Sequence, residues 1–590
     1  MASFRKPIAT LDAETDPFSK TNAKRGYIPQ PFIWGFYDAG YLESDRPFRY
    51  FEQAEDFVTW IRDKEYVIYA HNGGKFDYNY LKQFVDPFDR VSFINGRLAR
   101  FNIGIAEFRD SMNIFPTGLA AYKKQSFDYS ILERTKRYRP ENWARILEYL
   151  ESDCVNLFEI VHAFRERFGP TLTQASAAMR QWGKLSAEVI PQTRFPKFYD
   201  AFKQFYYGGR VECFHVGLID KPFKVVDINS AYPYAMLKQH PYSLTYSVSD
   251  GDARGDLTVA HACASFFRVR CRSRGAFPWK DPTGQYEDGA LSFPVDDTLR
   301  EYLITGHELA AAEDTRTADD LEILESFVFD DLTHFTLYVE HFYNERKVAK
   351  EKGDKAGDLF CKQMLTSLYG RYAMNSRRYF DYQILPPEFI GCLHRDNVKE
   401  WNDAEGRVWN FAGYFGPNVL ARSPLPEDKW RFYNVATAAS VTGATRAHLW
   451  RAICASDGVL YCDTDSIAAV DPVVDFGSEL GQWEVEGTFT EGAIAGKKLY
   501  GYKYVGKTGP IDANGNRVRY KVASKGARLT YAEVRKIAKG ETVRYTPEVP
   551  TYRISGFIDR ETGKREIARY ISREISMLPR NRKRLSTNEV

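Results

Sequence analysis

The chain has 590 residues, more than a single hydrophobic core can hold, so several domains are expected. Hydrophobic residues make up 44% of it and aromatic residues 15%, which excludes a largely disordered chain. The 81 basic residues nearly balance the 78 acidic ones, which excludes a uniformly basic nucleic-acid coat, and the eight cysteines form no C-x-x-C pair, which argues against a zinc ribbon. No segment has the apolar length of a signal peptide or a membrane span, so we expect a cytoplasmic protein without a membrane partner.

The N-terminal third alternates between predicted strands and helices. An apolar strand ending in acids is predicted at "KPIATLDAETD", and a second strand runs into a glycine turn at "EYVIYAHNGG". A long amphipathic helix is predicted at "ENWARILEYLESDCVNLFEIVHAFRERFG", and residues 172–205 are expected to be helical. This alternation predicts an α/β domain.

The remainder of the chain predicts α/β and α+β structure. The apolar strand "PFKVVDINSAYPYAM" carries an acid near its end, and residues 339–375 predict two helices around the glycine-rich break "KGDKAGD". Residues 250–330 are expected to be irregular and residues 376–432 loop-rich. The helix "NVATAASVTGATRAHLWRAICA" leads into the apolar stretch "LYCDTDSIAA", and the last hundred residues predict strands, short helices and a polar, basic tail.

One group of polar residues lies in the N-terminal third. Two carboxylates stand two apart at a strand end, an asparagine and an aspartate flank the glycine turn, and a tyrosine and an aspartate share one helix face. In chain order these residues are Asp12, Glu14, Asn72, Asp77, Tyr149 and Asp153. A hard cation such as Mg²⁺ prefers oxygen ligands, and two such ions about 4 Å apart activate water and stabilise a leaving oxygen. The group therefore predicts a two-metal hydrolytic site.

A second group lies further along the chain. Alternation along a strand places Asp463 and Asp465 on one face, where two ionised carboxylates repel each other. Asp227, at the end of another apolar strand, would complete a set of three carboxylates for two Mg²⁺ ions, whose charge offsets the repulsion. A single helical stripe presents a lysine for a triphosphate and a tyrosine for the nascent base pair; it consists of Lys362, Thr366 and Tyr369.

Both groups resemble known motifs. The first resembles, in order and spacing, the three motifs of the DEDDy-type 3′→5′ exonucleases, and "DINSAYP", "KQMLTSLYG" and "YCDTDS" resemble motifs A, B and C of the family-B DNA polymerases. The resemblance implies an RNase H-like exonuclease domain followed by palm, fingers and thumb. In the family motif C is a tight hairpin, so its two aspartates need not be equivalent ligands.

The resemblance also assigns roles to individual residues. The exonuclease metal ligands would be Asp12, Glu14, Asp77 and Asp153, with Tyr149 orienting the attacking water. The polymerase metal ligands would be Asp227 and Asp465, with Asp463 in support. Tyr232 would be the steric gate that blocks a ribose 2′-OH, and "KKLYGY" resembles the K-x-Y motif that holds the primer end. The other implied nucleotide contacts are Lys362, Tyr369, Thr366, Ser230, Arg346 and Lys350. The implied DNA contacts are Tyr206, Gly208, Gly209, Lys498, Tyr500, Asn72, Phe76, Ser111, Met112 and Thr464.

Two further elements indicate the protein-primed branch of the family. "YYGGR" resembles the Y-x-G-G element that links the two domains and grips template, and "FRDSMNIFP" resembles the single-strand-binding motif of the exonuclease domain. Extended segments between motifs A and B and between B and C correspond in that branch to two terminal-protein regions. The resemblance is greatest to the tectivirus-type bacteriophage polymerases and covers nearly the whole chain.

The resemblance implies a domain order and a set of partners. The expected ranges are the exonuclease at 1–180, a connecting segment at 181–215, the palm at 216–250 and 433–480, terminal-protein region one at 251–335, the fingers at 336–375, terminal-protein region two at 376–432, and the thumb with the C-terminal tail at 481–590. The expected partners are template and primer DNA, deoxynucleoside triphosphates and a terminal protein. Each active site would hold two Mg²⁺ ions, which Mn²⁺ can replace. The chain would act as a monomer, or as a heterodimer with the terminal protein, in the cytoplasm of a bacterial host.

Two positions depart from the family pattern, and two alternatives stay open. Thr366 stands where asparagine is usual and Ala231 where a larger apolar residue is usual. Threonine lacks the second hydrogen-bonding group of the amide, which predicts a raised apparent KM for nucleotides. One alternative is a nucleic-acid-primed family-B repair polymerase, against which the long segments between motifs argue. The other is a DNA-binding replication factor with vestigial sites, against which the intact acids argue.

Overall fold

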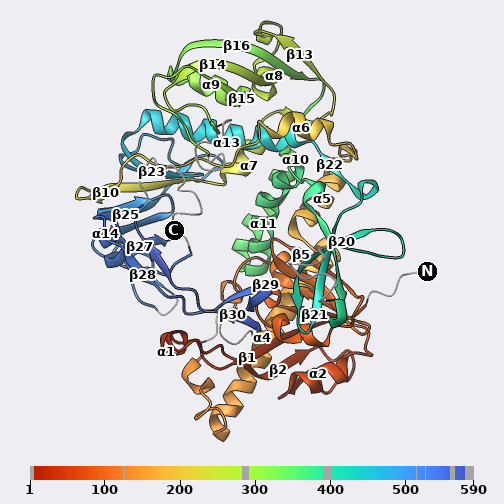
Figure 1. Ribbon diagram of the computed structural model, residues 1–590. Helices are drawn as coiled ribbons and strands as arrows, with labels where there is room; N and C mark the ends of the chain where they lie inside the picture. The colour runs from red at the N-terminus through yellow and green to blue at the C-terminus, as the bar shows by residue number, and fades with distance from the viewer. Residues whose placement is uncertain are drawn as a thin grey trace.

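The structure is a computed structural model that describes residues 6–123, 126–281, 291–389, 400–512, 515–524, 526–558 and 565–577 (Figure 1). Two large sheets organise it, one built mainly from the N-terminal third and one from residues after 210. A smaller sheet with two helices, and then a pair of long helices, are inserted in the sequence between the early strands of the second large sheet and its later ones. In these residue ranges, no helix is both long enough and apolar enough to cross a membrane.

The N-terminal sheet has the strand arrangement of an RNase H-like domain. In it, β1 (Ile8–Thr15) is flanked by the antiparallel β2 (Pro31–Tyr37) and the parallel β4 (Val67–Ala70). β4 is in turn parallel to β7 (Ala106–Asp110). The long α4 (Pro140–Phe168) packs across β1 and β2 with a buried apolar stripe, while its other side stays polar. The predicted fold of this third is confirmed.

Residues 376–432, expected to be loop-rich, form strands that extend the same sheet. β18 (Phe380–Leu385) pairs with β5 (Arg90–Ile94), and β21 (Asn418–Pro424) and β20 (Val408–Phe415) continue the sheet outward. The expectation was wrong because prolines and charged residues around these short strands obscure their alternation.

The second sheet is antiparallel and carries the polymerase motifs. In spatial order its strands are β27 (Tyr520–Ser524), β26 (Leu499–Tyr504), β25 (Trp483–Gly496), β11 (Phe223–Ile228), β24 (Ser466–Asp471), β23 (Asp457–Asp463) and β9 (Val211–Cys213), and the short β10 (Gly217–Ile219) also pairs with β25. α13 (Val435–Ala455) packs on this sheet and is buried on nearly all sides, because its small side chains let neighbouring elements approach. The sheet continues past residue 480, where the thumb was expected to begin.

Most of the segment 250–330, expected to be irregular, belongs to a small sheet with two helices that spans residues 246–329. Its strands are β13 (Tyr246–Asp250), β16 (Ala318–Phe329), β14 (Phe266–Ser273) and β15 (Arg300–Thr305). α8 (Val259–Ala264) and α9 (Gly306–Thr315) accompany the sheet, and α9 packs against α13 (Figure 1). Arginines alternate with apolar residues along β14, and this period-two pattern marks a half-buried strand. The expectation of irregular structure was therefore wrong.

The predicted helix pair is confirmed as α10 (Thr336–Glu351) and α11 (Lys355–Tyr372), which pack side by side. Gly353 reverses the chain with φ +70°, and Asp354 caps α11 by accepting a hydrogen bond from the Gly357 amide.

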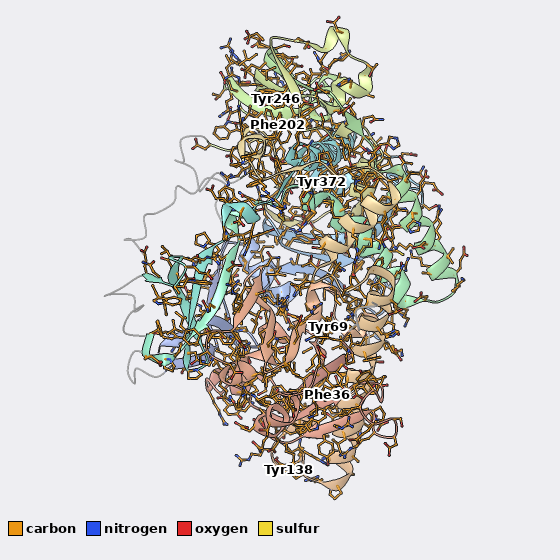
Figure 2. All side chains as sticks on the ribbon, turned by 90° about the vertical axis from the view of Figure 1, so that its right-hand side faces the viewer. Phe36, Tyr69, Tyr138, Phe202, Tyr246 and Tyr372 are labelled. Carbon is orange, nitrogen blue, oxygen red and sulfur yellow. The ribbon has the colours of Figure 1, made fainter. Side chains whose placement is uncertain are left out.

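A shared hydrophobic core ties the nuclease to the helix pair. Tyr69 of β4 and Tyr372 of α11, both labelled in Figure 2, belong to one cluster of buried residues. Towards the C-terminus, the hairpin of β29 (Thr551–Ile558) and β30 (Arg565–Arg569) reaches β20 of the N-terminal sheet (Figure 1). The expected polar, basic tail lies outside the described residues.

Candidate active sites

The structure brings the four predicted exonuclease carboxylates together at one end of β1. Asp12 and Glu14 lie on β1, Asp77 precedes the short helix α3 (Tyr78–Leu81), and Asp153 lies on α4. Burial raises the pKa of Glu14 to about 8, with further contributions from the charges of Asp153 and Asp77. Burial followed by the charges of Asp77, Glu14 and Asp153 holds the pKa of Asp12 well above its usual value. Such mutual repulsion marks a site that a cation would stabilise.

Asp77 has an oxygen available for that cation. Its side chain is buried, and its Oδ1 has no hydrogen-bond partner among the described residues. Burial, followed by the charge of Asp110, raises the pKa of Asp77 to about 7. An unpartnered buried carboxylate oxygen is costly, so a ligand at this point is favoured.

Tyr149 is held against the carboxylates by two aromatic residues that the sequence did not single out. Its ring stacks on Phe127, with 4.0 Å between centroids and 21° between planes. Its hydroxyl lies 3.1 Å from the Tyr129 hydroxyl. A hydrogen bond from Tyr149 lowers the pKa of Asp153, although burial, the larger effect, raises it. Tyr149 therefore has a fixed orientation next to a candidate metal ligand.

Arg97 and Asp110 hold the glycine turn before Asp77 in place. Neither residue was identified from the sequence. Asn72 adopts a left-handed backbone (φ +63°), and its Oδ1 accepts a hydrogen bond from Arg97 Nη1 at 2.5 Å. The same Arg97 nitrogen pairs with Asp110 Oδ2 at 2.9 Å. A side chain at Gly74 would approach Leu98 O to 2.1 Å, so only glycine fits there.

The other predicted single-strand contacts differ in exposure. Phe76 is partly exposed, and its ring lies 5.6 Å from Phe18 and 6.0 Å from Tyr552 of β29. Ser111 is fully buried, and its hydroxyl donates to Ala70 O. Its side chain therefore supports the turn in this conformation rather than presenting a surface to DNA. Met112 is partly exposed beside it.

The polymerase carboxylates meet on the second sheet. Asp227, the last residue but one of β11, lies opposite Ser466 of β24, and Asp463 and Asp465 flank Thr464 in a tight hairpin between β23 and β24. Thr464 has φ +67°, so the simple alternation of a strand is broken, as the family motif implies. Burial followed by the charge of Asp465 raises the pKa of Asp227 to about 7. Asp227 and Asp465 therefore face each other.

Asp463 has a different environment. Its Oδ1 pairs with Lys498 Nζ at 3.2 Å, and its Oδ2 accepts from the Tyr461 hydroxyl at 3.4 Å. Burial and then the charge of Asp463 raise the pKa of Asp465. Glu484 lies opposite Asp227 on β25 and adds negative charge that the motifs did not reveal. The two hairpin aspartates are thus inequivalent.

The predicted K-x-Y residues lie beside this hairpin. Lys498 occupies the turn between β25 and β26 with φ +56°, and its backbone amide donates to the Tyr461 hydroxyl at 2.9 Å. The ring of Tyr500 lies 5.0 Å from that of Tyr461 and stacks on Tyr502.

Two tyrosines from motifs A and B are stacked next to the carboxylates. Ser230, with φ +56°, starts α7 (Ala231–Met236), and Tyr232 follows on that helix. The Tyr232 ring stacks on Tyr369 of α11, with 4.4 Å between centroids and 15° between planes. Tyr206 packs against the same cluster. The structure therefore joins the predicted gate and the predicted base-pair contact into one aromatic wall.

The rest of the motif B stripe is exposed on α11. Lys362 and Thr366 are both exposed, and the Thr366 hydroxyl donates to Lys362 O and Gln363 O of its own helix, at 3.2 Å each. Arg346 of α10 forms an ion pair with Asp358 at 2.8 Å, while Lys350 is exposed. Arg346 is thus occupied by a contact between the two helices.

The YYGGR turn lies between α13 and the hairpin that carries Asp463 and Asp465. Arg446 of α13 donates through Nη1 to Tyr207 O at 2.8 Å and Gly208 O at 2.9 Å, and it forms a buried ion pair with Glu308 at 2.8 Å. The Thr464 amide donates to Arg210 O at 2.7 Å. A side chain at Gly209 would come within 2.7 Å of Thr464. Arg446 and Glu308 were not identified from the sequence.

The donor sets of both sites fit a hard cation. In the described parts of the chain, no three or more His, Cys, Asp or Glu side chains form a metal cage on their own. Mg²⁺ is usually held by one or two carboxylates together with waters and substrate phosphates rather than by an all-protein cage. Both sites offer carboxylate oxygens that repel one another, and Asp77 Oδ1 has no hydrogen-bond partner among the described residues. These features suit a metal ion that the protein shares with its substrate.

Comparisons with known proteins agree with both geometries. A family model for type B DNA polymerases, organellar and viral, matches residues 120–405. The DNA-directed DNA polymerase of Enterobacteria phage PRD1 is 35% identical over 543 residues, which cover 89% of this chain and 86% of the relative. The chain therefore belongs to the type B DNA polymerases of organelles and viruses. It is a DNA-directed DNA polymerase, similar to that of a tectivirus.

Solved structures show the same fold. The Phi29 DNA polymerase in a ternary complex with primer–template DNA and incoming nucleotide substrates matches with a TM-score of 0.66 and 15% identity, over 97% of this chain and 100% of that one. Its binary complex with primer–template DNA matches with a TM-score of 0.68 and 14% identity, over the same shares. The expected exonuclease, palm, fingers and thumb architecture is thus shared over nearly the whole chain.

Proposed function

We propose that the chain is a protein-primed replicative DNA polymerase that proofreads with its own 3′→5′ exonuclease and displaces the non-template strand. The observation that carries this proposal is the presence of two separate carboxylate clusters, on two sheets of one chain. Primer–template DNA and incoming nucleotides accompany the Phi29 enzyme in its solved complexes, which supports the same substrates here. A phage-encoded enzyme of this kind would act in the cytoplasm of a bacterial host.

In the polymerase site, Asp227 and Asp465 would hold divalent metal ions together with the triphosphate. The ions would be Mg²⁺, which Mn²⁺ can replace. Bound ions there neutralise charge on the attacking and leaving oxygens. Lys498 balances Asp463, which keeps that aspartate in a supporting position. The Tyr232–Tyr369 stack would form the wall that excludes a ribose 2′-OH. Exposed Lys362 would meet the triphosphate, and Tyr500 the primer end.

In the exonuclease site, Asp12, Glu14, Asp77 and Asp153 would hold the ions. Tyr149, oriented by its neighbouring aromatic rings, would direct the attacking water. We further propose that the Asn72 turn and Phe76 receive the primer end.

Two substitutions separate the activities. We expect Asp465→Ala to abolish primer extension and leave 3′→5′ degradation of single-stranded DNA intact, and Asp12→Ala to do the reverse, because the clusters lie on different sheets. Asp465→Asn and Asp12→Asn are the matched isosteric controls, which remove the charge with little change in volume. If neither alanine variant alters either activity, the catalytic assignment is wrong.

Protein priming has its own test. We propose that residues 251–335 and 376–432 contact a terminal protein, whose hydroxyl starts synthesis. The full-length enzyme, a candidate terminal protein, labelled deoxynucleotide and Mg²⁺ should yield a covalent protein–nucleotide adduct, and Asp465→Ala should not. Extension of an annealed primer without any adduct would instead support the nucleic-acid-primed alternative.

A further inference from the structure

A cavity of about 360 Å³ lies where α13 and the end of α7 meet the small sheet-and-helix part of residues 246–329. α8 and α9 close it from the other side, and alanines from these helices form its apolar wall. Its polar lining consists of Lys238, Gln239, His307, His448 and Arg451. None of the described residues that line it is acidic. Neither active site uses this cavity.

His307 gives the cavity an unsatisfied polar group. Its side chain is 6% exposed, and its Nε2 has no hydrogen-bond partner among the described residues. Burial, followed by the charges of His240 and Lys238, holds the pKa of His307 well below its usual value. A buried polar nitrogen without a partner is costly, so a ligand that supplies one is favoured.

The positive charge of the cavity is only partly balanced. Arg451 pairs with Asp314 of α9 at 2.6 Å, and both side chains are exposed enough for that pair to be weak. Lys238 lies 5.1 Å from the centre of the Tyr234 ring. Among the described residues, no carboxylate lies within ion-pairing distance of Lys238. An anion entering the cavity would therefore meet two cations, of which Arg451 is already paired with Asp314, and no acidic side chain among the residues that line the cavity.

We propose that this cavity is a binding site for a small phosphate-bearing anion. Lys238 and Arg451 supply charge, the Gln239 amide supplies a donor, and His307 donates from Nε2 when it takes up a proton with the anion. Free phosphate, pyrophosphate and the phosphates of a nucleotide share this chemistry.

The site is connected to motif A. Lys238 follows α7, the helix that carries Tyr232. His448 bonds through Nε2 to Gly481 O at 2.9 Å, and the Gly481 amide donates to Asn229 O at 2.9 Å. An anion in the cavity thus contacts the elements that hold the residues after Asp227.

Two cysteines make the proposal testable on the full-length protein. Cys263 lines the cavity, whereas Cys454, on α13, is exposed outside it. We expect phosphate, pyrophosphate or deoxyadenosine triphosphate, without divalent metal, to slow alkylation of Cys263 by iodoacetamide and leave Cys454 unchanged, as measured by peptide mass spectrometry. Protection by phosphate identifies a monophosphate site, and protection by pyrophosphate or nucleotide alone identifies a polyphosphate site.

The matched variants are Lys238→Gln and Lys221→Gln, the latter an exposed lysine ahead of β11. Lys238→Gln should weaken binding of the protecting anion roughly tenfold or more, because a charge-assisted hydrogen bond is lost. Lys238→Arg should restore that binding. Arg451→Gln tests the second cation in the same way, and buried Cys361 and Cys462 should stay unreactive in each variant, which shows that the variant is folded. If no anion protects Cys263, or if Lys238→Gln and Lys221→Gln are protected equally, the proposal is overturned.

Discussion

Replacing Arg446 by methionine tests whether the buried ion pair beneath the YYGGR turn holds the polymerase site in shape. The Arg446 and Glu308 side chains are only 3% and 2% exposed, and their Nε–Oε1 distance is 2.8 Å. Arg446 Nη1 also donates hydrogen bonds to the carbonyls of Tyr207 and Gly208, in the turn that contacts the hairpin of Asp463 and Asp465. The substitution therefore leaves one buried carboxylate and two carbonyls without their donor.

The expected cost follows from that burial. Removing one partner of a buried ion pair typically costs about 3–5 kcal/mol, because the remaining charge stays desolvated. Arg451→Met is the matched control: Arg451 lies on the same helix and pairs with Asp314 of the same α9, but the two side chains are 41% and 59% exposed. Loss of such a surface pair costs about 0–1 kcal/mol.

Hydrogen exchange measured by mass spectrometry reports local opening of this region. In Arg446→Met, peptides covering residues 206–210 and α13 should exchange roughly 100-fold faster or more, since 1.4 kcal/mol corresponds to a factor of about ten. Primer extension should fall while degradation of single-stranded DNA is retained. Adding Glu308→Leu should recover part of the stability. Exchange in Arg446→Met no faster than in Arg451→Met would refute the reasoning.

Three further predictions concern single residues. Burial and nearby carboxylates raise the pKa of Glu14 from 4.5 to about 8, so between these pH values the folded metal-free protein binds more protons than the unfolded chain and loses stability as the pH rises. Glu14→Gln should flatten the resulting fall of the thermal midpoint with pH. Equal slopes in the wild type and the variant would contradict the assignment. Thr366→Asn should lower the apparent KM for nucleotides in steady-state primer extension, because the threonine hydroxyl bonds to its own helix; an unchanged or higher KM counts against this. Gly209→Ala should impair primer extension but not degradation, because the new Cβ would lie 2.7 Å from the Thr464 side chain. Gly370→Ala is the control and should retain extension, because a Cβ there has no atom within 4 Å. Equal extension by both variants would exclude the steric clash.

Residues that bear chemistry were recognisable from local spacing. Asp12 and Glu14 two apart, Tyr149 and Asp153 four apart, and Asp463 and Asp465 in one short stretch are patterns of period two or of one helical turn. Such patterns are visible without knowledge of the fold, because each lies within a single element. The helix pair around Gly353 was predicted for the same reason.

The residues that hold those groups in place were not recognisable. Arg97 lies 25 residues from Asn72, and Arg446 lies 138 residues from Glu308. No local spacing marks such partners, because their contact depends on how separate elements pack. The strands of 376–432 were not predicted either, because prolines and charged residues around them obscure their alternation, and only their pairing with one another and with β5 reveals them.

The sequence by itself determined which carboxylates, tyrosines and lysines form the two chemical groups, because motif spacing within a strand, turn or helix is a local property. Only the tertiary structure decided that Asp463 pairs with Lys498 while Asp465 faces Asp227, and that Tyr232 stacks on Tyr369. These distinctions arise between elements that are distant in the chain, where burial and the approach of charges set each group's environment. The different environments of two aspartates two residues apart are therefore a property of the fold.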